Sequence, residues 1–570
     1  MKKNSRLLPL GVLSTAIALL LLAPTGAPEH LSGDEPDAVP GTTPGQIAVD
    51  FTDGASPEVV DAAGKAAGVT FVLASPVSQD EALYVADADN PAAALAALEG
   101  NPDVEAAEPV LEMEAFAYPD DPLYEKQWNF PLIHAPVAWR VGGGKGVTVA
   151  VIDTGVSPLP DLPADQILEG RSFVPGASTA KDDHGHGTHV AGTIAQATNN
   201  GIGAAGIAPN VKILPLKVLG ASGGGMSTWI AAAIDEAVDQ GAQVINLSLG
   251  GGHSRVIVNA VEKARKAGVV VVAAAGNTGR QGIGSPADAP AAIAVTAVGP
   301  DDALAPYSSW GKGVEIAAPG GNKNIANGGI IQATIEKGGG QQFAEWQGTS
   351  MASPHVAAAA AVLFGAGADN ADEVERYLKE GAVTREDPLR FGAGRLDVGA
   401  SVRKLLIAKR GLLFVVGGLL SLGLSLLGAL PRGARTAALL TGATVAGGLF
   451  LLPLLPLPPS TWLDLLSRPF LQWPGKLWSG FPLWQSCLLP VGVAVILGPS
   501  KALGPIALGL CAGVGGYLLY GAATGNTELW LSGWLFGVAR TWLTINGSLC
   551  LLAGMAVAGM QKMRRTEAAA

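Results

Sequence analysis

The string GTSMASPHVA at residues 348–357 puts a serine where an apolar helix begins. Ser350 precedes the run VAAAAAVLF, so its hydroxyl is expected beside backbone N–H groups that have no partner within the helix. These groups and the positive end of the helix dipole favour a negative charge that develops next to them. The position therefore suits a nucleophile. An isolated serine at a helix start is more often only an N-cap, so the choice depends on what else the chain carries.

Two other strings can carry acid–base chemistry. Asp153 follows the apolar run of AVIDTGV, where a carboxylate at a strand end can orient a histidine. His186 and His189 lie in DDHGHGTHVAGTIAQA (182–197), and we predict that His186 is a general base and His189 a packed or orienting residue. Two alternatives compete. DTG also marks aspartic proteases, which need a second aspartate, and close histidines can bind a metal, although no third ligand follows at zinc spacing.

A fourth residue follows another apolar run. Asn277 comes at the end of VVVVAAAGNTG, between Gly276 and Gly279. An asparagine after a strand is usually a turn former. Close to a nucleophile, its amide would instead donate a hydrogen bond to the oxyanion of a tetrahedral intermediate, together with the backbone N–H of Ser350.

The elements that must position these residues alternate between strand and helix. Uniformly apolar strands separated by helices predict an α/β fold with a parallel sheet sandwiched by helices, whose carboxyl ends gather functional groups. The expected strands are 147–152, 211–218, 243–249, 269–275 and 291–298, with helices near 226–239 and 254–267.

A smaller unit precedes this α/β part. Its strands are expected near 45–52, 69–75, 82–88 and 103–110, and its helices near 57–67 and 91–99. The order βαββαβ predicts a ferredoxin-like fold, which we assign to residues 45–117. Residues 28–44 are rich in Pro, Gly and acidic side chains and indicate a linker.

Composition predicts membrane segments at both ends of the chain. Residues 1–27 carry Lys2, Lys3 and Arg6 before an apolar run, as in a signal peptide or a retained signal anchor. Residues 401–570 predict an all-α transmembrane bundle of about five helices. The candidate spans are 411–430, 434–456, 484–498, 502–523 and 541–560.

Charge predicts the orientation of these spans. If residues 30–400 lie outside the cell, the basic residues of the alternate connections and of the tail fall inside, as the positive-inside rule requires. They are Arg432, Arg435, Lys501, Lys562, Arg564 and Arg565. The basic residues Arg403, Lys404, Lys409 and Arg410 oppose this orientation. We still expect a multi-pass cell-membrane protein with the α/β part on the extracytoplasmic side, because long domains cross largely regardless of charge.

The net charge and the number of cysteines argue against two other classes of function, nucleic-acid binding and catalysis by a cysteine nucleophile. The formal net charge is −11 and the soluble part has no basic cluster, which argues against nucleic acid as a partner. The three cysteines are Cys487, Cys511 and Cys550, all in the membrane part. The exported part therefore has neither a disulfide nor a cysteine nucleophile.

Together the strings VIDTG, HGTHVAGT, AAAGN and GTSMASPHVA resemble those of the subtilases, the subtilisin-like serine proteases, in both order and spacing. The chain order Asp, His, Ser is the order found in subtilisin. The resemblance covers about residues 118–400 and implies a serine endopeptidase in which Asp153, His186 and Ser350 form the catalytic triad and Asn277 stabilises the oxyanion. The unit at 45–117 resembles the inhibitory propeptide of the family, so the enzyme is expected to be made as a zymogen.

The resemblance also implies binding residues. SLGG (Ser248, Leu249, Gly250, Gly251) and the run Gly223, Gly224, Gly225 are similar to the segments that pair with the substrate backbone, while Gly276 and Gly284 would line the pocket for the residue before the cut. No acidic residue occupies the matching positions, so we expect apolar or medium side chains there. A calcium site is implied at Asp161 and Asn200, with carbonyls of Thr198, Ile202 and Ala204. The chemistry itself needs no cofactor.

These features predict three partners, namely a polypeptide substrate, the protein's own propeptide and the lipid bilayer. One alternative is a protein whose membrane bundle performs the function, while a catalytically idle protease fold serves as a binding domain. Another is a membrane assembly whose protease domain processes one dedicated client. The presence of all three triad residues and of Asn277 favours the active endopeptidase over the idle domain.

Overall fold

The computed structural model describes residues 42–52, 54–74, 82–111, 119–336, 340–454, 466–470, 486–524 and 536–569. The predicted signal segment (1–27) and most of the linker lie outside these residues. The chain divides into two compact units, one of residues 18–117 and one of residues 1–17 with 118–570. Each unit is described by itself.

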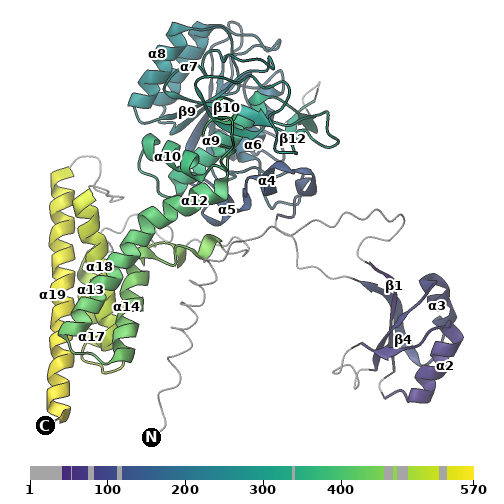
Figure 1. Ribbon diagram of the computed structural model, residues 1–570, viewed down its shortest axis with the longest axis vertical. Helices are drawn as coiled ribbons and strands as arrows, with labels where there is room; N and C mark the ends of the chain where they lie inside the picture. The colour runs from purple at the N-terminus through teal and green to yellow at the C-terminus, as the bar shows by residue number, and fades with distance from the viewer. Residues whose placement is uncertain are drawn as a thin grey trace. The chain divides into compact units, whose positions relative to one another are not determined.

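The smaller unit has a four-stranded sheet in the order β2-β3-β1-β4. Its elements follow the chain as β1 (Thr42–Phe51), α2 (Pro57–Ala67), β2 (Val72–Leu73), β3 (Leu83–Asp87), α3 (Pro91–Leu98) and β4 (Val104–Leu111). Strand β1 pairs antiparallel with both β3 and β4. Both helices lie on one face of this sheet (Figure 1), where Ile47, Val49 and Phe51 of β1 are fully buried.

The larger unit is built on a seven-stranded parallel sheet in the order β11-β10-β9-β8-β5-β7-β6. Its strands are β5 (Thr148–Asp153), β6 (Arg171–Ser172), β7 (Lys212–Lys217), β8 (Val244–Leu247), β9 (Val270–Ala274), β10 (Ala292–Val298) and β11 (Val314–Pro319). Strands β5, β8 and β9 are neighbours, so their carboxyl ends bring Asp153, Ser248 and Asn277 to one edge. The five predicted strands are confirmed, each within two residues at either end.

Helices cover both faces of this sheet (Figure 1). Helices α7 (Ser227–Asp239) and α8 (Arg255–Lys266) pack on one face. Helices α6 (His186–Ala195) and α9 (Thr349–Ala366) pack on the other, with α10 (Ala371–Gly381) and α12 (Val398–Leu406) beyond them. Short elements complete the unit: η1 (Tyr124–Lys126), α4 (Asn129–Leu132), α5 (Pro136–Arg140), η2 (Ala164–Gln166), α11 (Pro388–Phe391) and the antiparallel pair β12 (Ile330–Ile335) and β13 (Gln341–Trp346).

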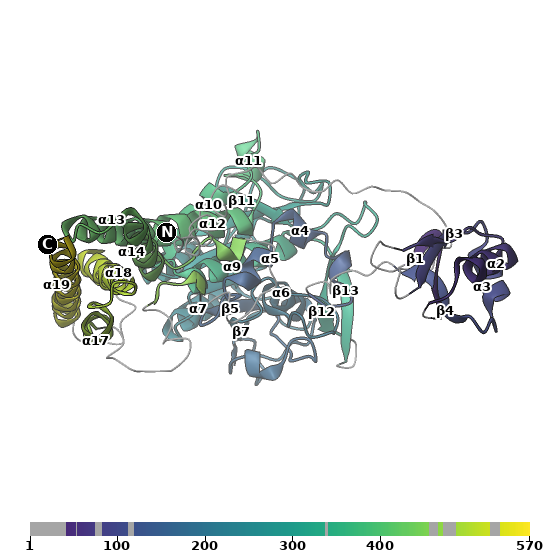
Figure 2. The ribbon, with the colours of Figure 1, turned by 90° about the horizontal axis from the view of Figure 1, so that it is seen from below.

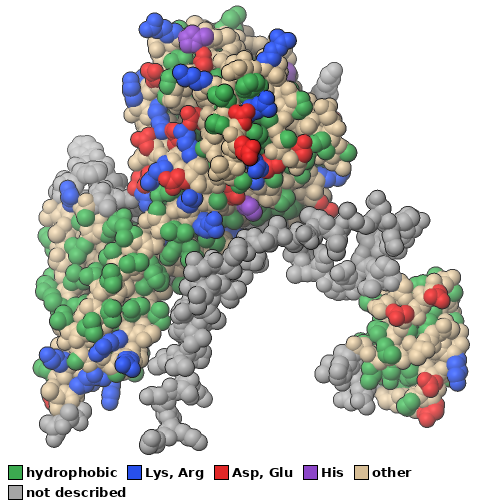
Figure 3. Space-filling view, viewed as in Figure 1, with side chains coloured by type: hydrophobic (Ala, Val, Ile, Leu, Met, Phe, Trp, Pro, Cys, Tyr) green, Lys and Arg blue, Asp and Glu red, His purple; other side chains and the backbone are tan. Residues whose placement is uncertain are grey.

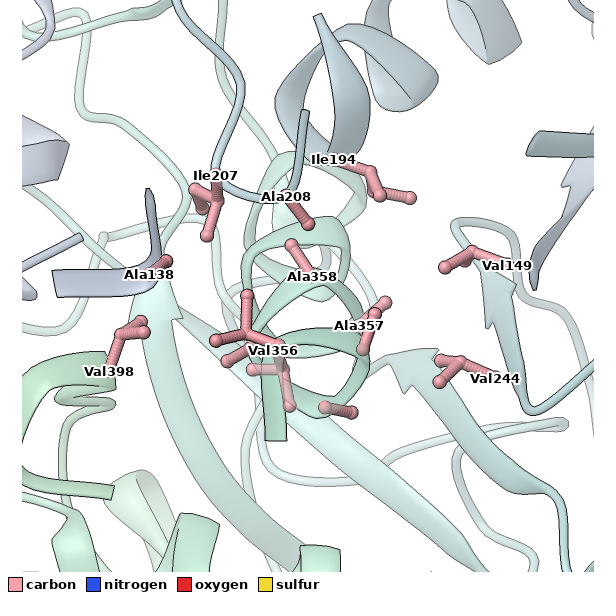
Figure 4. Close-up of a cluster of buried hydrophobic side chains, with 14 of the residues drawn as sticks. Ala138, Val149, Ile194, Ile207, Ala208, Val244, Val356, Ala357, Ala358 and Val398 are labelled. Atoms are coloured by element: carbon pink, nitrogen blue, oxygen red, sulfur yellow. The ribbon is translucent and has the colours of Figure 1, made fainter. Parts of the chain in front are cut away.

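Helix α9 lies inside the core rather than on its surface. Val356, Ala357 and Ala358 are fully buried, with strands, helices and loops around them. Figure 4 shows these residues facing Val149 and Val244 of the sheet on one side and Ile207, Ala138 and Val398 on the others. A helix that is apolar all round is buried on every side. This is why the run VAAAAAVLF can be both highly apolar and part of the soluble domain.

Apolar helices follow the α/β part. They are α13 (Leu412–Leu427), α14 (Arg432–Gly447), α17 (Leu488–Leu497), α18 (Gly504–Thr524) and α19 (Phe536–Ala569), with a short turn η4 (Leu452–Leu454). Figure 2 shows α18 surrounded by α13, α14, α17 and α19, and it packs against each of them. By length and composition, four described helices could cross a membrane: α9, the continuous segment Val398–Leu427, α18 and most of α19. Burial of α9 in the protein core makes it a core helix, not a span.

The helix that leaves the α/β part continues without a break into the first apolar helix. Between α12 and α13 lies a π-helical segment, η3 (Ile407–Gly411). Within it, Lys409 forms ion pairs with Asp369 and with Glu373, the latter at 2.8 Å. Arg410 is buried and donates to the carbonyls of Ala366 and Ser467, each at 3.1 Å. Lys409 and Arg410, two of the basic residues that opposed the predicted orientation, are therefore bonded to neighbouring protein groups.

Candidate active site

Asp153 and His186 meet where strand β5 ends and helix α6 begins. Asp153 is fully buried, and its Oδ1 accepts hydrogen bonds from His186 Nδ1 and from the backbone N–H of Thr154, both at 2.7 Å. Gly187 permits this approach, because a Cβ there would lie 2.1 Å from the carbonyl oxygen of Gly155. Since Nδ1 donates to the carboxylate, Nε2 carries the lone pair that a general base needs.

Opposing influences set the pKa of His186. Burial lowers it, but the charge and the hydrogen bond of Asp153, together with the charge of Asp182, outweigh burial and raise the pKa above its usual value. Asp182 is itself buried and held by Thr188, which donates from its N–H at 2.9 Å and its hydroxyl at 2.6 Å. The protonated form of His186 is therefore favoured by two nearby carboxylates.

Ser350 is the second residue of helix α9. The helix begins after Gly348, whose φ of 154° is one that L side chains rarely adopt. The hydroxyl of Ser350 donates to the carbonyl of Ser248 at 3.0 Å, and the hydroxyl of Ser248 donates back to the carbonyl of Ser350 at 2.7 Å. These bonds fix the start of α9 against the end of β8. In this structure the Ser350 proton is thus directed at a carbonyl, and it must turn to reach an imidazole; such hydrogen bonds often tighten only when substrate is bound.

Asn277 is held by the residue that precedes Ser350. Its Oδ1 accepts from both the N–H and the hydroxyl of Thr349, each at 2.9 Å. The hydroxyl of Thr349 in turn accepts from the N–H of Gly276 at 3.1 Å. With its oxygen used in this way, the amide of Asn277 has its Nδ2 left to donate, and Asn277 is exposed on a cavity wall. Thr349 is a positioning residue that the sequence did not suggest.

Two adjoining cavities open beside these residues. A cavity of about 290 Å³ is lined by Ser350, Asn277 and Thr349, with Gly276, Gly284 and Ser309 among its other walls. A cavity of about 560 Å³ is lined by His186, with the segments Gly223–Gly225 and Ser248–Gly252 on its walls. Leu249, Gly250 and Gly251 line both. All nine glycine, serine and leucine positions predicted to contact substrate therefore lie on these walls, and none of the described lining residues is acidic.

His189 is packed in the core and lies behind the site. It is fully buried, its Nε2 bonds to the carbonyl of Ala344 at 3.0 Å, and its ring stacks on Trp346 at 4.6 Å. Burial lowers the pKa of His189 to about 4. The same indole lies 6.1 Å from the His186 ring in a stacked orientation, so Trp346 links the two histidines. This is the packed or orienting role expected for His189.

The predicted calcium ligands gather only in part. Asp161 is fully buried, and its carboxylate accepts from Gln196 Nε2 at 2.5 Å and from Asn200 Nδ2 at 2.9 Å. Burial, with a smaller contribution from the charge of Asp121, raises the pKa of Asp161 to about 6. Among the described residues, no three His, Cys, Asp or Glu side chains group closely enough to hold a metal ion.

Backbone and amide groups complete this cluster. The Ala204 carbonyl accepts from Gln196 Nε2 at 2.9 Å, and the Asn200 Oδ1 accepts from the N–H of Ile202 at 2.9 Å. Asp121, which the sequence did not suggest, is buried and accepts from the N–H groups of Asn199 at 2.8 Å and Asn200 at 3.3 Å. The buried carboxylates of Asp121 and Asp161 and the amide oxygen of Asn200, which come from three chain segments, are hard oxygen ligands of the kind calcium prefers. Asn200 would have to turn its amide oxygen toward the ion.

Comparisons with known proteins show which family this chain resembles. A model of the subtilase family matches residues 144–394, and a model of the fervidolysin N-terminal prodomain matches residues 41–109. Subtilisin Savinase of Lederbergia lenta is 41% identical over 279 residues, which are 48% of this chain and 98% of that protein. The chain belongs to the subtilase family.

Other relatives extend the comparison. Thermitase of Thermoactinomyces vulgaris is 43% identical over 44% of this chain and 86% of its own. The thermophilic serine proteinase of Bacillus sp. (strain AK1) is 40% identical over 59% of this chain and 82% of its own. A solved structure of a protease from Pseudoalteromonas arctica covers 51% of this chain and 100% of its own, with 34% identity and a TM-score of 0.48.

This subtilase is therefore a serine endopeptidase with a prodomain, made as a zymogen. Its α/β fold with a seven-stranded parallel sheet is the subtilisin-like fold that the sequence predicted. Neither family match extends into the apolar helices that begin at Leu412.

Proposed function

We propose that this subtilase is a membrane-anchored endopeptidase in which Ser350, His186 and Asp153 carry the reaction. The observation that supports it most directly is the 2.7 Å bond from His186 Nδ1 to the buried Asp153 carboxylate, beside a cleft that Ser350 also lines. Asp153 keeps the imidazole in the tautomer whose Nε2 accepts a proton, and it stabilises the imidazolium.

In the first half of the reaction, Ser350 Oγ attacks the scissile carbonyl as its proton passes to His186. The oxyanion receives hydrogen bonds from the backbone N–H of Ser350 and from Asn277 Nδ2, near the positive end of the α9 dipole. His186 then protonates the leaving amine, which departs and leaves an acyl-enzyme on Ser350. In the second half, His186 takes a proton from water, the resulting hydroxide attacks the acyl group, and Ser350 Oγ takes the proton back from His186.

The substrate backbone would lie between the segments Ser248–Gly251 and Gly223–Gly225. Neither segment belongs to a strand, and both line the larger cavity, so an extended peptide in that cavity would lie beside both of them. Gly276 and Gly284 line the smaller cavity, whose described walls carry no charged side chain. We therefore propose a preference for apolar or medium side chains before the cut. A preparation that cleaves only after Arg or Lys would contradict this.

The unit at 45–117 is proposed to be a ferredoxin-like inhibitory propeptide that precedes a catalytic domain at 118–400. Its sheet order and two one-sided helices support that fold, and the fervidolysin prodomain match supports the role. Residues 1–27 and 28–44 are proposed as the signal peptide or anchor and the linker. The polypeptide substrate and the propeptide would then compete for one cleft.

Residues 401–570 are proposed to anchor the enzyme in a bilayer. The C-terminal part of α19 lies beside the ends of two other helices. Gln561 of α19 donates to Gly498, the residue after α17, at 2.7 Å, and Arg565 donates to Ala429, between α13 and α14. Figure 3 shows Lys and Arg clustered at this end of the bundle, with an apolar belt between it and the α/β part. This end would face the cytoplasm, which puts the protease domain on the extracytoplasmic side.

Calcium is proposed to bind at Asp161, Asn200 and Asp121, with the carbonyls of Thr198, Ile202 and Ala204 as further ligands. The ion would hold the loop 198–204 against the segment at Asp121 and would take no part in the chemistry. The support is the pair of buried carboxylates, which a cation would neutralise.

One experiment tests the catalytic assignment. The wild-type chain and Ser350→Ala are expressed in membranes, treated with a fluorophosphonate that labels active serines, and their N-termini are sequenced. Ser350→Ala should lose labelling, peptide hydrolysis and propeptide release, whereas the exposed control Ser178→Ala should keep all three. Hydrolysis that persists in pure Ser350→Ala would remove Ser350 from the nucleophile role.

Membrane attachment is tested on the same samples. Extraction of the membranes at alkaline pH should leave the full-length chain in the pellet and release a chain that ends at residue 400. Release of the full-length chain would contradict the anchor without affecting the catalytic proposal.

A further inference from the structure

A closed ring of polar contacts lies just beyond the segment Ser248–Gly251. Asp288 bonds through one carboxylate oxygen to His253 Nδ1 at 2.6 Å, and through the other it accepts from the Ser285 hydroxyl at 2.6 Å. The Ser285 hydroxyl accepts from the N–H of Ser254 at 2.9 Å. Because Ser254 follows His253 in the chain, these contacts close on themselves. We call this set the His253–Asp288 ring.

The ring ties together two chain segments that form the wall between the cavities. The carbonyl of Ser285 accepts from the N–H of Gly251 at 3.0 Å. A Cβ added at Gly284 would lie 1.9 Å from the carbonyl oxygen of Gly251, so the two segments touch backbone to backbone. Gly251 and Gly284 line the smaller cavity beside Ser350, whereas Ser254 and Ser285 line the larger one. A shift of either segment changes both cavities.

Capping of helix α8 does not account for the ring. Ser254 is the N-cap, and its side chain accepts from the N–H of Ile257 at 3.5 Å. The ring uses the backbone N–H of Ser254 instead, which lies outside the helical bonds. The bond between His253 and Asp288 adds nothing to the cap. The side chain of His253 is 70% exposed, so no packing requirement places it there.

We propose that His253 and Asp288 are positioning residues that fix the separation of segments 248–252 and 284–285. In this way they set how tightly the cleft binds the part of an extended polypeptide that lies on the N-terminal side of the cut. This rests on the proposed function of the cleft. A peptide that adds itself to a segment edge through backbone hydrogen bonds needs that edge held in place before it arrives. A substrate that reaches only the smaller cavity makes few of those bonds and depends less on the ring.

The test compares two substrates with the same apolar residue before the cut. One is a single-residue ester, and the other is a tetrapeptide anilide that extends along both cavities. With the full-length enzyme in detergent, Asp288→Ala should raise KM for the tetrapeptide about five- to tenfold, as expected for loss of two hydrogen bonds from a preorganised edge. KM for the ester and kcat for both substrates should change less than about twofold.

Three variants make the test specific. Asp288→Asn should restore the tetrapeptide KM, because its amide oxygen accepts from Ser285 and its nitrogen can donate to an imidazole nitrogen. His253→Ala should reproduce the selective loss. Asp239→Ala, at an exposed position at the far end of α7, should change neither KM nor kcat for either substrate.

Other outcomes would overturn the proposal. An equal rise in KM for both substrates would show a general distortion of the site. A lower melting temperature with unchanged KM would reduce the ring to a structural tie. Failure of Asp288→Asn to restore KM would show that the hydrogen bonds are not the cause. Hydrolysis by Ser350→Ala would instead refute the assignment of the cleft, so the two proposals fail in different ways.

Discussion

Thr349 should act on catalysis only through Asn277. Its hydroxyl donates one of the two hydrogen bonds that hold Asn277 Oδ1, each at 2.9 Å. In the proposed mechanism this contact aims Nδ2 at the oxyanion. Thr349→Val keeps the shape of the side chain and removes this bond, while the bond from the Thr349 N–H stays. Thr349→Ser keeps the hydroxyl and is the matched control.

The magnitude follows from the bonds lost. One intramolecular hydrogen bond is worth about 0.5–1.5 kcal/mol, so misorientation of Asn277 should lower kcat by roughly two- to thirteenfold. KM should stay nearly constant, because the oxyanion exists only in the transition state and the tetrahedral intermediate. Asn277→Leu, which removes the donor itself, should cost about 2.7–4 kcal/mol, the loss found for the oxyanion asparagine of subtilisin.

The decisive assay is a double-mutant cycle on peptide hydrolysis at saturating substrate. In the Asn277→Leu background, Thr349→Val should change kcat by less than about twofold, because the group that it orients is absent. The N–H of Gly276 also loses its acceptor, and that loss should appear as a lower melting temperature of both Thr349→Val forms. If Thr349→Val lowers kcat by the same factor in both backgrounds, Thr349 acts on the oxyanion directly or through helix α9, and the reasoning from Asn277 is refuted.

Further predictions concern titratable groups. Asp153 and Asp182 raise the pKa of His186 despite its burial, so kcat/KM should fall as the pH decreases through a value above 6.5, the usual pKa of histidine. Asp182→Asn should move this fall in kcat/KM to lower pH. If the pH dependence is the same in Asp182→Asn, the charge of Asp182 does not raise the pKa of His186. The raised pKa of Asp161, about 6, means that the folded state binds this proton more tightly than the unfolded state, so without a cation its contribution to stability should fall as pH rises from about 4 to 6. Calcium should therefore raise the melting temperature of Ser350→Ala more at pH 8 than at pH 5, and Asp161→Asn should remove the difference; a calcium effect that is equal at both pH values would contradict it.

Regular patterns made much of the fold predictable. The five strands are unbroken apolar runs, as expected for strands that are buried on both faces of a parallel sheet. The ends of these runs mark the strand ends, so β5 and β10 begin and end within one residue of the expected positions. Parallel strands then put Asp153 and Asn277 at one edge with no further information. Recognition of Ser350 and His186 rested on strings in which a glycine precedes a helix start.

Side-chain contacts between distant segments were not predictable in the same way. Thr349 orients Asn277 across 72 residues, and Asp121 bonds the loop at Asn199 across 78 residues. Neither contact follows a period in the sequence, because each depends on how two loops meet after the sheet has formed. The close contact between Gly187 and the Gly155 carbonyl is a further example, because only the structure names the neighbour that requires a glycine there.

The connection between the serine and the apolar helices also depends on packing that no local pattern reports. Ser350 precedes Leu412 by about sixty residues, a length that as an unstructured linker would let the catalytic domain move far from its anchor. Instead, α9 carries Ser350 near its first residue and, at its last residue, Ala366 accepts a hydrogen bond from the buried Arg410 at 3.1 Å. Ser350 and the first apolar helix are thus connected by one helix of 18 residues, about 27 Å long, and a side-chain hydrogen bond. Because most residues of α9 are buried in the core, a bend in this helix would disturb the packing around it, so Arg410 ties the first apolar helix to a stiff element that also carries Ser350.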